Sequence, residues 1–369
     1  MHPRQVSRFH VLALCASLAF AAPSAHANLK AVDEDIPWDM DAGGTAEDRA
    51  TYILGTTGPV TLDLGYGPMV GINHPNNHLI ITSGSSLLGT SGYIGSGDTS
   101  NYNLVNVVGA GSSWIIEDRL DVGGDGSHNH LSVEDGAYVS TSWAYVGLTE
   151  AAHHNSLHIS GSGSRMVVQS GMTLGSTGTN NTLHIGYGGA LSVDGMLGVG
   201  GYDTGSDNAA FVYDRGSILS VQQLGIGGYG TQRNSLTIQD AALVRISEYW
   251  SIDYALMIDP EGDSFLNFAG GFLAIEGDAR DLIGDLISQG AFRFGNEAAW
   301  TIGSADDFIF DYFANEADAL AFTGYAGLAG YTIVTNMPGS PIPEPSTYAA
   351  LAGCAVLGLA AFRRYRFNR

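Results

Sequence analysis

The sequence predicts an all-β chain wound as a right-handed parallel β-helix, a solenoid with coils of about 26 residues. Three observations predict this fold: an asparagine that recurs at a nearly constant interval, a short alternation of apolar residues after each copy, and a high glycine content. Glycine supplies 51 of the 369 residues, roughly double its usual share of ~7%. Glycine at this level, between short runs of Val, Ile and Leu, indicates many short strands joined by tight turns.

The recurring asparagine defines the repeat. Its spacings are 26, 26, 26, 26, 27 and 26 residues, and copies that stay in phase over this length indicate a repeat architecture. We call this set the asparagine column: Asn77, Asn103, Asn129, Asn155, Asn181, Asn208 and Asn234.

A strand is predicted after each asparagine. The residues two and four positions later are apolar in every copy, as in Leu157 and Ile159, whereas the residue between them varies from Ile80 to His158. This two-residue period is typical of a strand with one buried face. A corner rich in glycine or serine follows, and then two further short stretches such as 190–193 and 197–200. Three short strands per repeat predict one coil of a parallel β-helix, and the usual crossover preference predicts right-handed winding.

Two other repeat architectures fit the sequence less well. Leucine-rich repeats have periods of about 20–29 residues but need an L-x-x-L-x-L core and a helical return segment. The copies here lack both, and their glycines would destabilise a helix. A propeller blade needs about 40–50 residues, which is longer than this repeat.

The asparagine column has a predicted structural role. Asparagine tolerates the left-handed backbone conformation that a sharp corner demands. Its side-chain amides, stacked at the ~4.8 Å strand spacing, can donate and accept hydrogen bonds from coil to coil. We therefore expect the column asparagines to adopt the left-handed conformation and to form a hydrogen-bonded ladder.

The ends of the solenoid need caps because the terminal coils have open edges. The sequence predicts an N-terminal cap over 28–70, β-helix repeats over 71–275 and a C-terminal cap over 276–341. The last region contains a candidate helix at Ala279–Ile287 and aromatic-rich strands at 307–313 and 330–335.

Residues 1–27 predict a secretory signal peptide. Arg4 and Arg8 precede an apolar run, and Ala25 and Ala27 form an A-x-A cleavage pattern immediately before Asn28. A segment of this kind directs export and is removed from the mature protein.

A second targeting segment is predicted at 342–369. An apolar stretch at 347–362 is close to the length of ~20 residues that a membrane-spanning helix needs. The arginines after it favour a cytoplasmic tail. The whole segment, IPEPSTYAALAGCAVLGLAAFRRYRFNR, resembles a PEP-CTERM sorting signal. The residues that carry the resemblance are Pro343, Glu344, Pro345, Arg363, Arg364 and Arg366.

This resemblance implies a location and a processing partner. Proteins with such signals are held at the inner membrane of a Gram-negative cell by the C-terminal helix until an exosortase, a membrane cysteine protease, processes them. They then reach the cell surface or the medium, and the family is associated with exopolysaccharide and biofilm. The body of the chain is also similar to autotransporter-like β-helical repeat proteins, through the stretches 267–274, 277–278 and 331–335.

Charge limits the partners of the exported body. Residues 28–341 carry nine basic and 36 acidic residues, a net charge of −27. Nucleic acid and anionic lipid both require a basic surface, so neither is expected as a direct partner. An acidic exopolysaccharide would have to be held through bridging divalent cations. Both cysteines, Cys15 and Cys354, lie in the targeting segments, so the body must be stable without disulfides.

The repeat contains few candidates for chemistry. His158 and His184 occupy the same position in adjacent coils, where they can share a metal ion, but no cysteine or aspartate accompanies them. The acidic loops at 203–207 and 259–263 do not match known calcium motifs. Trp114 and Trp143 lie in adjacent repeats but at different offsets, so they are expected to be partly buried packing residues and not a stacked platform for a glycan. No residue is assigned as catalytic, as cofactor-binding or as a metal ligand.

The observations together favour an exported structural or adhesive protein of the cell surface or extracellular matrix, and not an enzyme. One alternative is a carbohydrate-active β-helix enzyme, either a polysaccharide lyase or a hydrolase, because this fold hosts both. A lyase of this fold usually has a Lys or Arg base, but Lys30 is the only lysine and lies outside the repeat. The arginines of the repeat lie at different offsets from their asparagines and do not stack: Arg119, Arg165, Arg215, Arg233 and Arg245. The second alternative is a metal-binding surface module built on the histidine pair.

Overall fold

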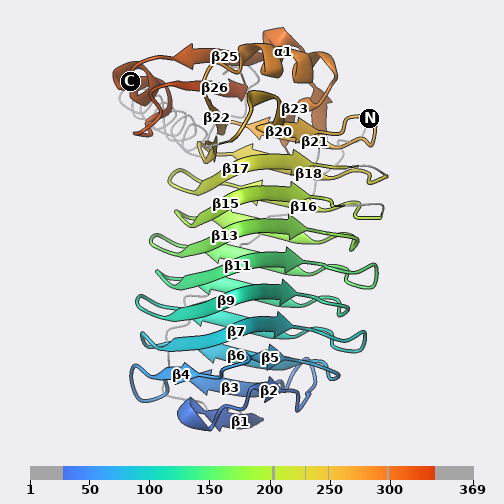
Figure 1. Ribbon diagram of the computed structural model, residues 1–369, viewed down its shortest axis with the longest axis vertical. Helices are drawn as coiled ribbons and strands as arrows, with labels where there is room; N and C mark the ends of the chain where they lie inside the picture. The colour runs from blue at the N-terminus through green and yellow to red at the C-terminus, as the bar shows by residue number, and fades with distance from the viewer. Residues whose placement is uncertain (1–27, 202–203, 229, 248, 297–298, 337–369) are drawn as a thin grey trace, which may run out of the picture.

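The computed structural model describes residues 28–201, 204–228, 230–247, 249–296 and 299–336. It is an all-β parallel solenoid of about 10 turns, in which the coils stack along one long axis (Figure 1). The N-terminal strands lie at one end of the stack, and helix α1 (Arg280–Ser288) lies at the other. The predicted signal peptide and sorting segment fall outside the described residues.

Two long sheets form the walls of the solenoid, and successive strands alternate between them. Sheet A contains, in spatial order, β1 (Leu29–Val32), β3 (Ala50–Leu54), β6 (Asn77–Ile81), β8 (Leu104–Val108), β10 (His130–Glu134), β12 (Ser156–Ser160), β14 (Thr182–Gly186), β16 (Ala209–Val212), β18 (Ser235–Gln239), β21 (Phe265–Ala269), β23 (Phe292–Asn296) and β24 (Ala299–Ile302). Sheet B contains β2 (Asp39–Met40), β5 (Met69–Val70), β7 (Ser86–Ile94), β9 (Ser113–Val122), β11 (Tyr138–Val146), β13 (Arg165–Leu174), β15 (Ala190–Val199), β17 (Ile218–Ile226), β19 (Leu243–Ile246), β22 (Phe272–Glu276), β26 (Tyr331–Asn336) and β25 (Phe308–Phe313). Two short strands lie beside sheet B, with β4 (Thr61–Asp63) paired to β7 and β20 (Leu256–Ile258) paired to β17.

Each coil has two strands where the sequence predicted three. The stretches 190–193 and 197–200 were expected to be separate strands, but the single strand β15 runs from Ala190 to Val199. The pairing of β15 with β17 shifts register between Val193 and Met196. A bulge of this kind bends a strand without ending it, so the second and third predicted strands stay in one sheet.

The core consists of the inward residues that the alternation predicted. All fourteen apolar residues at positions two and four of the repeat, including Leu157 and Ile159, are at most 1% exposed. They form one hydrophobic cluster that continues from coil to coil. Burying a Val, Leu or Ile side chain contributes about 1.5–3 kcal/mol relative to leaving it exposed, so the core stabilises the rod without disulfides.

The asparagine column lies at the beginning of seven strands of sheet A, from β6 to β18, and its side chains are buried. In all six intervals the backbone N–H of one asparagine donates to Oδ1 of the next, at 2.8–3.0 Å. The side-chain amide also donates to that oxygen in four of the six intervals. The last bond runs from the Asn234 N–H to Oγ of Ser264.

The left-handed conformation predicted for the column asparagines is wrong, because it occurs one residue earlier. The left-handed conformation belongs to the residue before each asparagine, which has φ between +53° and +61°. These residues are Asn76, Tyr102, His128, His154, Asn180, Asp207 and Arg233. The corner therefore turns one residue earlier, which leaves the column asparagine free to bond to the next coil from an ordinary backbone conformation.

A glycine packs against six of the seven column asparagines. Gly147, at the end of β11, has φ +77°, and a Cβ there would overlap the carboxamide of Asn181. Gly71, Gly95, Gly123, Gly175 and Gly200 have the same relation to an asparagine of the column. These glycines explain why the strands of sheet B so often end in Gly.

The parallel pairing extends beyond the predicted repeat region at the N-terminal end. Strand β1 pairs with β3, and β3 pairs with β6, in parallel. The region 28–70 therefore contains short parallel strands together with irregular segments.

The C-terminal end closes with antiparallel strands. Strand β26 pairs antiparallel with both β22 and β25, and β24 pairs antiparallel with β23. Helix α1 lies where the sequence predicted a helix and buries Ile283, Leu286 and Ile287. A second helix, α2 (Glu316–Thr323), was not predicted.

Replacing Asn155 by alanine tests the column. The substitution removes the Oδ1 atom that accepts from the Asn129 N–H at 2.8 Å. A buried donor without a partner costs about 1–3 kcal/mol, so the urea midpoint of unfolding is expected to fall. The control is Ser160→Ala on the outer face of β12, which is expected to change the midpoint little. Equal midpoints for the two variants would contradict the role of the column.

Replacing Gly147 by alanine tests the fit of glycine against the column. A side chain is disfavoured by the left-handed backbone at this position, and the new methyl group would also overlap the Asn181 carboxamide. The backbone strain alone costs about 1–3 kcal/mol. The matched control is Gly198→Ala, because a Cβ at Gly198 would have Thr173 Cγ2 as its nearest neighbour, at 3.9 Å. Thermal unfolding should show a clear loss of stability for Gly147→Ala and none for Gly198→Ala.

Candidate functional site

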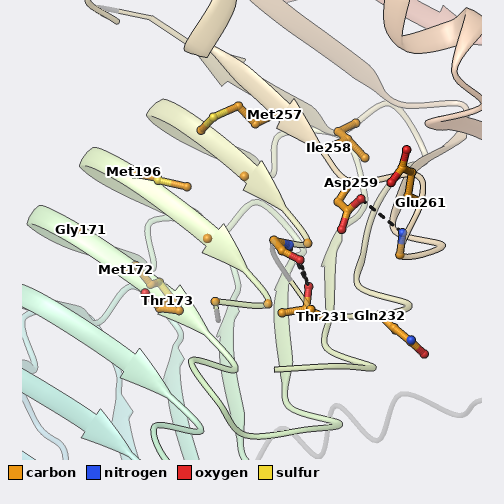
Figure 2. Close-up of a pocket in the computed structure, with 18 of the residues that line it drawn as sticks. Gly171, Met172, Thr173, Met196, Thr231, Gln232, Met257, Ile258, Asp259 and Glu261 are labelled. Atoms are coloured by element: carbon orange, nitrogen blue, oxygen red, sulfur yellow. Dashed lines mark hydrogen bonds between the residues drawn. The ribbon is translucent and has the colours of Figure 1, made fainter. Parts of the chain in front are cut away.

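The outer face of sheet B carries a groove of about 880 Å³, which we call the glycine groove (Figure 2). It crosses strands β11, β13, β15, β17 and β20, so it runs along the axis of the solenoid. The residues that line it are Trp143, Ser170, Gly171, Met172, Thr173, Met196, Gly198, Gly200, Gly201, Gly225, Gly227, Gly228, Gly230, Thr231, Gln232, Met257, Ile258, Asp259, Glu261 and Gly262.

The groove arises from a change of side-chain size within one outward column of sheet B. In the register of the sheet this column reads Tyr93, Asp121, Tyr145, Thr173, Gly198, Gly225 and Met257. Side chains cover the sheet from Tyr93 to Thr173, the two glycines leave it uncovered, and Met257 closes the far end. The two glycines thus form the floor of the groove.

The two walls differ in chemistry. Figure 2 shows Met196 and Met257 on the strand side, and Thr231, Gln232, Asp259 and Glu261 on the loop side. Met196 is 41% exposed, and its Cε lies over Gly225. On the polar wall, Oδ1 of Asp259 accepts from the Gly262 N–H at 3.3 Å. The groove therefore has one apolar and one hydrogen-bonding side.

Trp143 lies at the N-terminal end of the groove. Its indole packs over Gly171, where a Cβ would lie 2.8 Å from the ring, and it remains 45% exposed. The sequence predicts partly buried packing for both tryptophans; Trp143 fits this expectation, whereas Trp114 is fully buried. The two rings differ because Trp114 occupies an inward position of β9, whereas Trp143 stands beside a glycine on the outer face.

An ion pair borders the groove at the coils below Trp143. Arg119 Nε donates to Asp121 Oδ1 at 2.7 Å, and its guanidinium lies 4.6 Å from the Tyr145 ring centroid. Burial raises the pKa of Asp121, and the adjacent guanidinium partly opposes that shift. No Lys, Arg or His occurs among the described residues of the groove lining itself.

The histidine pair belongs to a row on the outer face of sheet A. The ring centroids of His158 and His184 are 5.7 Å apart, and those of His130 and His158 are 6.4 Å apart. The His184 ring stacks on Phe211 at 4.9 Å. Among the residues that the structure describes, no three His, Cys, Asp or Glu side chains gather so that they could hold a metal ion.

The acidic loops that were considered for calcium make local ion pairs. Asp207 pairs with Arg233, with two contacts of 2.6 Å, and Asp263 pairs with Arg293. Asp207 and Arg233 belong to the left-handed corner positions, as do Tyr102, His128 and His154, whose rings stack at 4.7 and 4.8 Å. The corner positions thus form their own outward column.

The sorting residues cannot be placed, because Pro343, Glu344, Pro345 and the C-terminal arginines lie outside the described residues, as do Ala25 and Ala27. Over the part of the chain that the structure describes, no helix is both long and apolar enough to cross a bilayer. Sequence reasoning missed the glycine groove, although a signal was present. The stretches 197–200 and 224–227 place a glycine inside a strand pattern, which often marks a close approach of a ligand.

Comparison with known proteins adds no relative: no protein-family model, no curated protein and no solved structure matches the chain. The class of protein that the fold defines is therefore a parallel β-solenoid.

Substituting His184 by phenylalanine tests the histidine row through pH. Burial and the neighbouring His158 lower the pKa of His184 from 6.5 to about 4. Below pH ~6.5 the unfolded chain binds a proton that the folded chain does not, so stability is lost as the pH falls toward 4. Phenylalanine fits, because Phe211 occupies the same position in the next coil.

The measurement is the melting temperature between pH 7 and about 5, where unfolded carboxylates stay mostly ionised. The decrease on acidification should be smaller in His184→Phe than in the unchanged protein. Ser160→Ala is the control, since it lies on the outer face of the neighbouring strand β12 and carries no titratable group, and it should keep the full decrease. The same decrease in all three proteins would refute the assignment.

Proposed function

We propose that the chain is an exported, right-handed β-solenoid with a structural or adhesive role at the cell surface or in the extracellular matrix. It is sorted by an exosortase-type protease and associates with exopolysaccharide or another glycan. Before processing it is held at the inner membrane by its C-terminal helix, and afterwards it is on the surface or released.

The observation that supports this role most is the bonding of the rod from coil to coil. The asparagine column and the parallel sheets continue over the repeats without a break in the core. A solenoid bonded in this way keeps its length because each coil is stabilised by its neighbours. Length and persistence are the properties that a matrix or adhesive protein needs.

The negative charge of the body determines how the chain can associate with anionic and with uncharged polysaccharides. The body carries a net charge of −27, which keeps the rod soluble and repels anionic polymers. Contact with an anionic polysaccharide therefore requires divalent cations, and chelation should release it. An uncharged polysaccharide needs no such bridge.

A carbohydrate-active enzyme is the second candidate, and the glycine groove is the observation that favours it. A hydrolase places two carboxyl groups on either side of the scissile bond. The acidic residues among the described lining are Asp259 and Glu261, two positions apart in one loop on the same wall. Release of reducing ends from polysaccharide by the full chain, and its loss in Asp259→Asn or Glu261→Gln, would support the enzyme over the adhesive role.

The sorting proposal is tested with the triplet Pro343-Glu344-Pro345 replaced by alanines in a Gram-negative host that contains an exosortase. The unchanged chain should be shortened at its C-terminus and appear on the surface or in the medium. The variant should keep its full mass in the inner-membrane fraction. The matched control replaces Pro338 and Pro341, which lie in the same proline-rich stretch outside the triplet, and should behave as the unchanged chain.

Two further comparisons complete this test. Processing should also stop in a host without the exosortase, and cells lacking the chain should retain less matrix polysaccharide than cells that carry it. Normal processing of the triplet variant would overturn the sorting assignment. Unchanged matrix retention would overturn the adhesive role.

A further inference from the structure

We propose that the glycine groove binds an extended, uncharged glycan chain, with its long direction along the solenoid axis. The inference rests on the proposed adhesive role and adds the ligand class and the site to it. It is carried by the groove floor, the two unlike walls and the charge of the lining.

The fold does not require the glycines of the floor. Gly198 and Gly225 lie inside strands, and neither has the left-handed backbone that favours glycine. A Cβ at Gly198 would have nothing closer than Thr173 Cγ2 at 3.9 Å, and one at Gly225 would meet only the mobile end of Met196. Other coils place tyrosine in the same column, as at Tyr145. Glycine inside a strand weakens it, and often marks a site where a ligand approaches closely.

The walls match the two kinds of surface on a sugar ring. A pyranose presents C–H groups on its faces and hydroxyls around its edge. The exposed indole of Trp143 and the thioether of Met196 provide apolar contact for the faces. Gln232 and Asp259, on the opposite wall, provide donors and acceptors for the hydroxyls (Figure 2). Aromatic side chains commonly supply this combination of an apolar surface and a defined geometry in binding sites.

The backbone of the floor argues against a peptide ligand. An extended peptide binds a sheet by adding a strand to an open edge. The floor here is the face of a sheet, where β15 pairs with β13 on one side and with β17 on the other, and β20 continues the ladder. The main-chain groups of the floor are therefore already hydrogen-bonded and cannot pair with a peptide. A sugar does not need them, because it binds through side chains and an apolar surface.

Charge and dimensions define the glycan further. The described lining has no Lys, Arg or His, and it includes the carboxylates of Asp259 and Glu261. A uronic acid or sulfated chain would be repelled in a groove that has no cation to pair with it. Four strand-to-strand steps of ~4.8 Å, from β11 to β20, give a groove about 19 Å long, which accommodates a short run of rings. The coil spacing is close to the length of one sugar in an extended chain.

The test measures binding of the purified full-length chain to hexasaccharides by titration calorimetry. The probes are uncharged hexamers of the glucan, mannan and chitin types, with oligogalacturonate as the anionic comparison. At least one uncharged probe should bind, and oligogalacturonate should not. Gly198→Tyr fills the floor with the residue that its column already has at Tyr145, and Trp143→Ala removes the apolar platform. Each should weaken binding about tenfold or more, whereas Ser220→Tyr, on the outer face of β17 outside the groove, should not.

The thermal stability of all three variants is measured beside binding, so that a misfolded variant is recognised. Gly198→Tyr is expected to fold because its position is open. Binding that is insensitive to Gly198→Tyr, or a preference for oligogalacturonate or for an apolar peptide, would overturn the site. If no uncharged probe binds while cells carrying the chain still retain matrix, the groove assignment fails and the adhesive role stands. If cells with and without the chain also retain the same amount of matrix polysaccharide, both the groove assignment and the adhesive role fail.

Discussion

The hydrogen bond between the backbone N–H of one column asparagine and Oδ1 of the next is the constraint on which the rest of the structure depends. Because it recurs in every interval of the column, the asparagines of successive coils stay 26 or 27 residues apart. Sheet B tolerates more variation, since Arg165 pairs with Ala190 whereas Ala190 pairs with Ile218. The turns between the two sheets absorb the difference. Because the column keeps the register of sheet A, the same positions of every repeat face the core.

A consequence of this constraint is that function is confined to the outward columns. Inward positions must be apolar and of suitable size, because interiors are close-packed. Outward positions need only be compatible with a strand, so they vary from coil to coil: imidazoles contact one another on sheet A, and tyrosines are replaced by glycines on sheet B. In the outward column of sheet B, the Tyr145 side chain stabilises the strands, whereas Gly198 and Gly225 provide no such contribution. Neighbouring coils offset the loss, as expected for a solenoid whose repeats stabilise one another.

Sequence patterns predicted most of the fold and little of the site. The repeat length, the buried face and the helix near Ile283 follow from local periodicity, and the structure confirms them. The left-handed corner was placed one residue too late, because asparagine and the residue before it are both plausible at a turn. The merging of two short strands into β15 was also missed, since a bulge depends on pairing with neighbours rather than on the strand's own sequence. Trp114 was expected to be partly buried, but its inward position on β9 buries it fully.

The sequence by itself determined the coil, the inward residues and the acidic character of the body, because each depends on residue type and spacing along the chain. Only the tertiary structure decided which residues share an outward column. Gly198, Gly225 and Trp143 are far apart in the sequence, and register brings them to one groove. The loop that carries Asp259 joins them from a later coil (Figure 2). Register is a property of pairing between strands, so a binding surface built across coils becomes visible only when the coils are stacked.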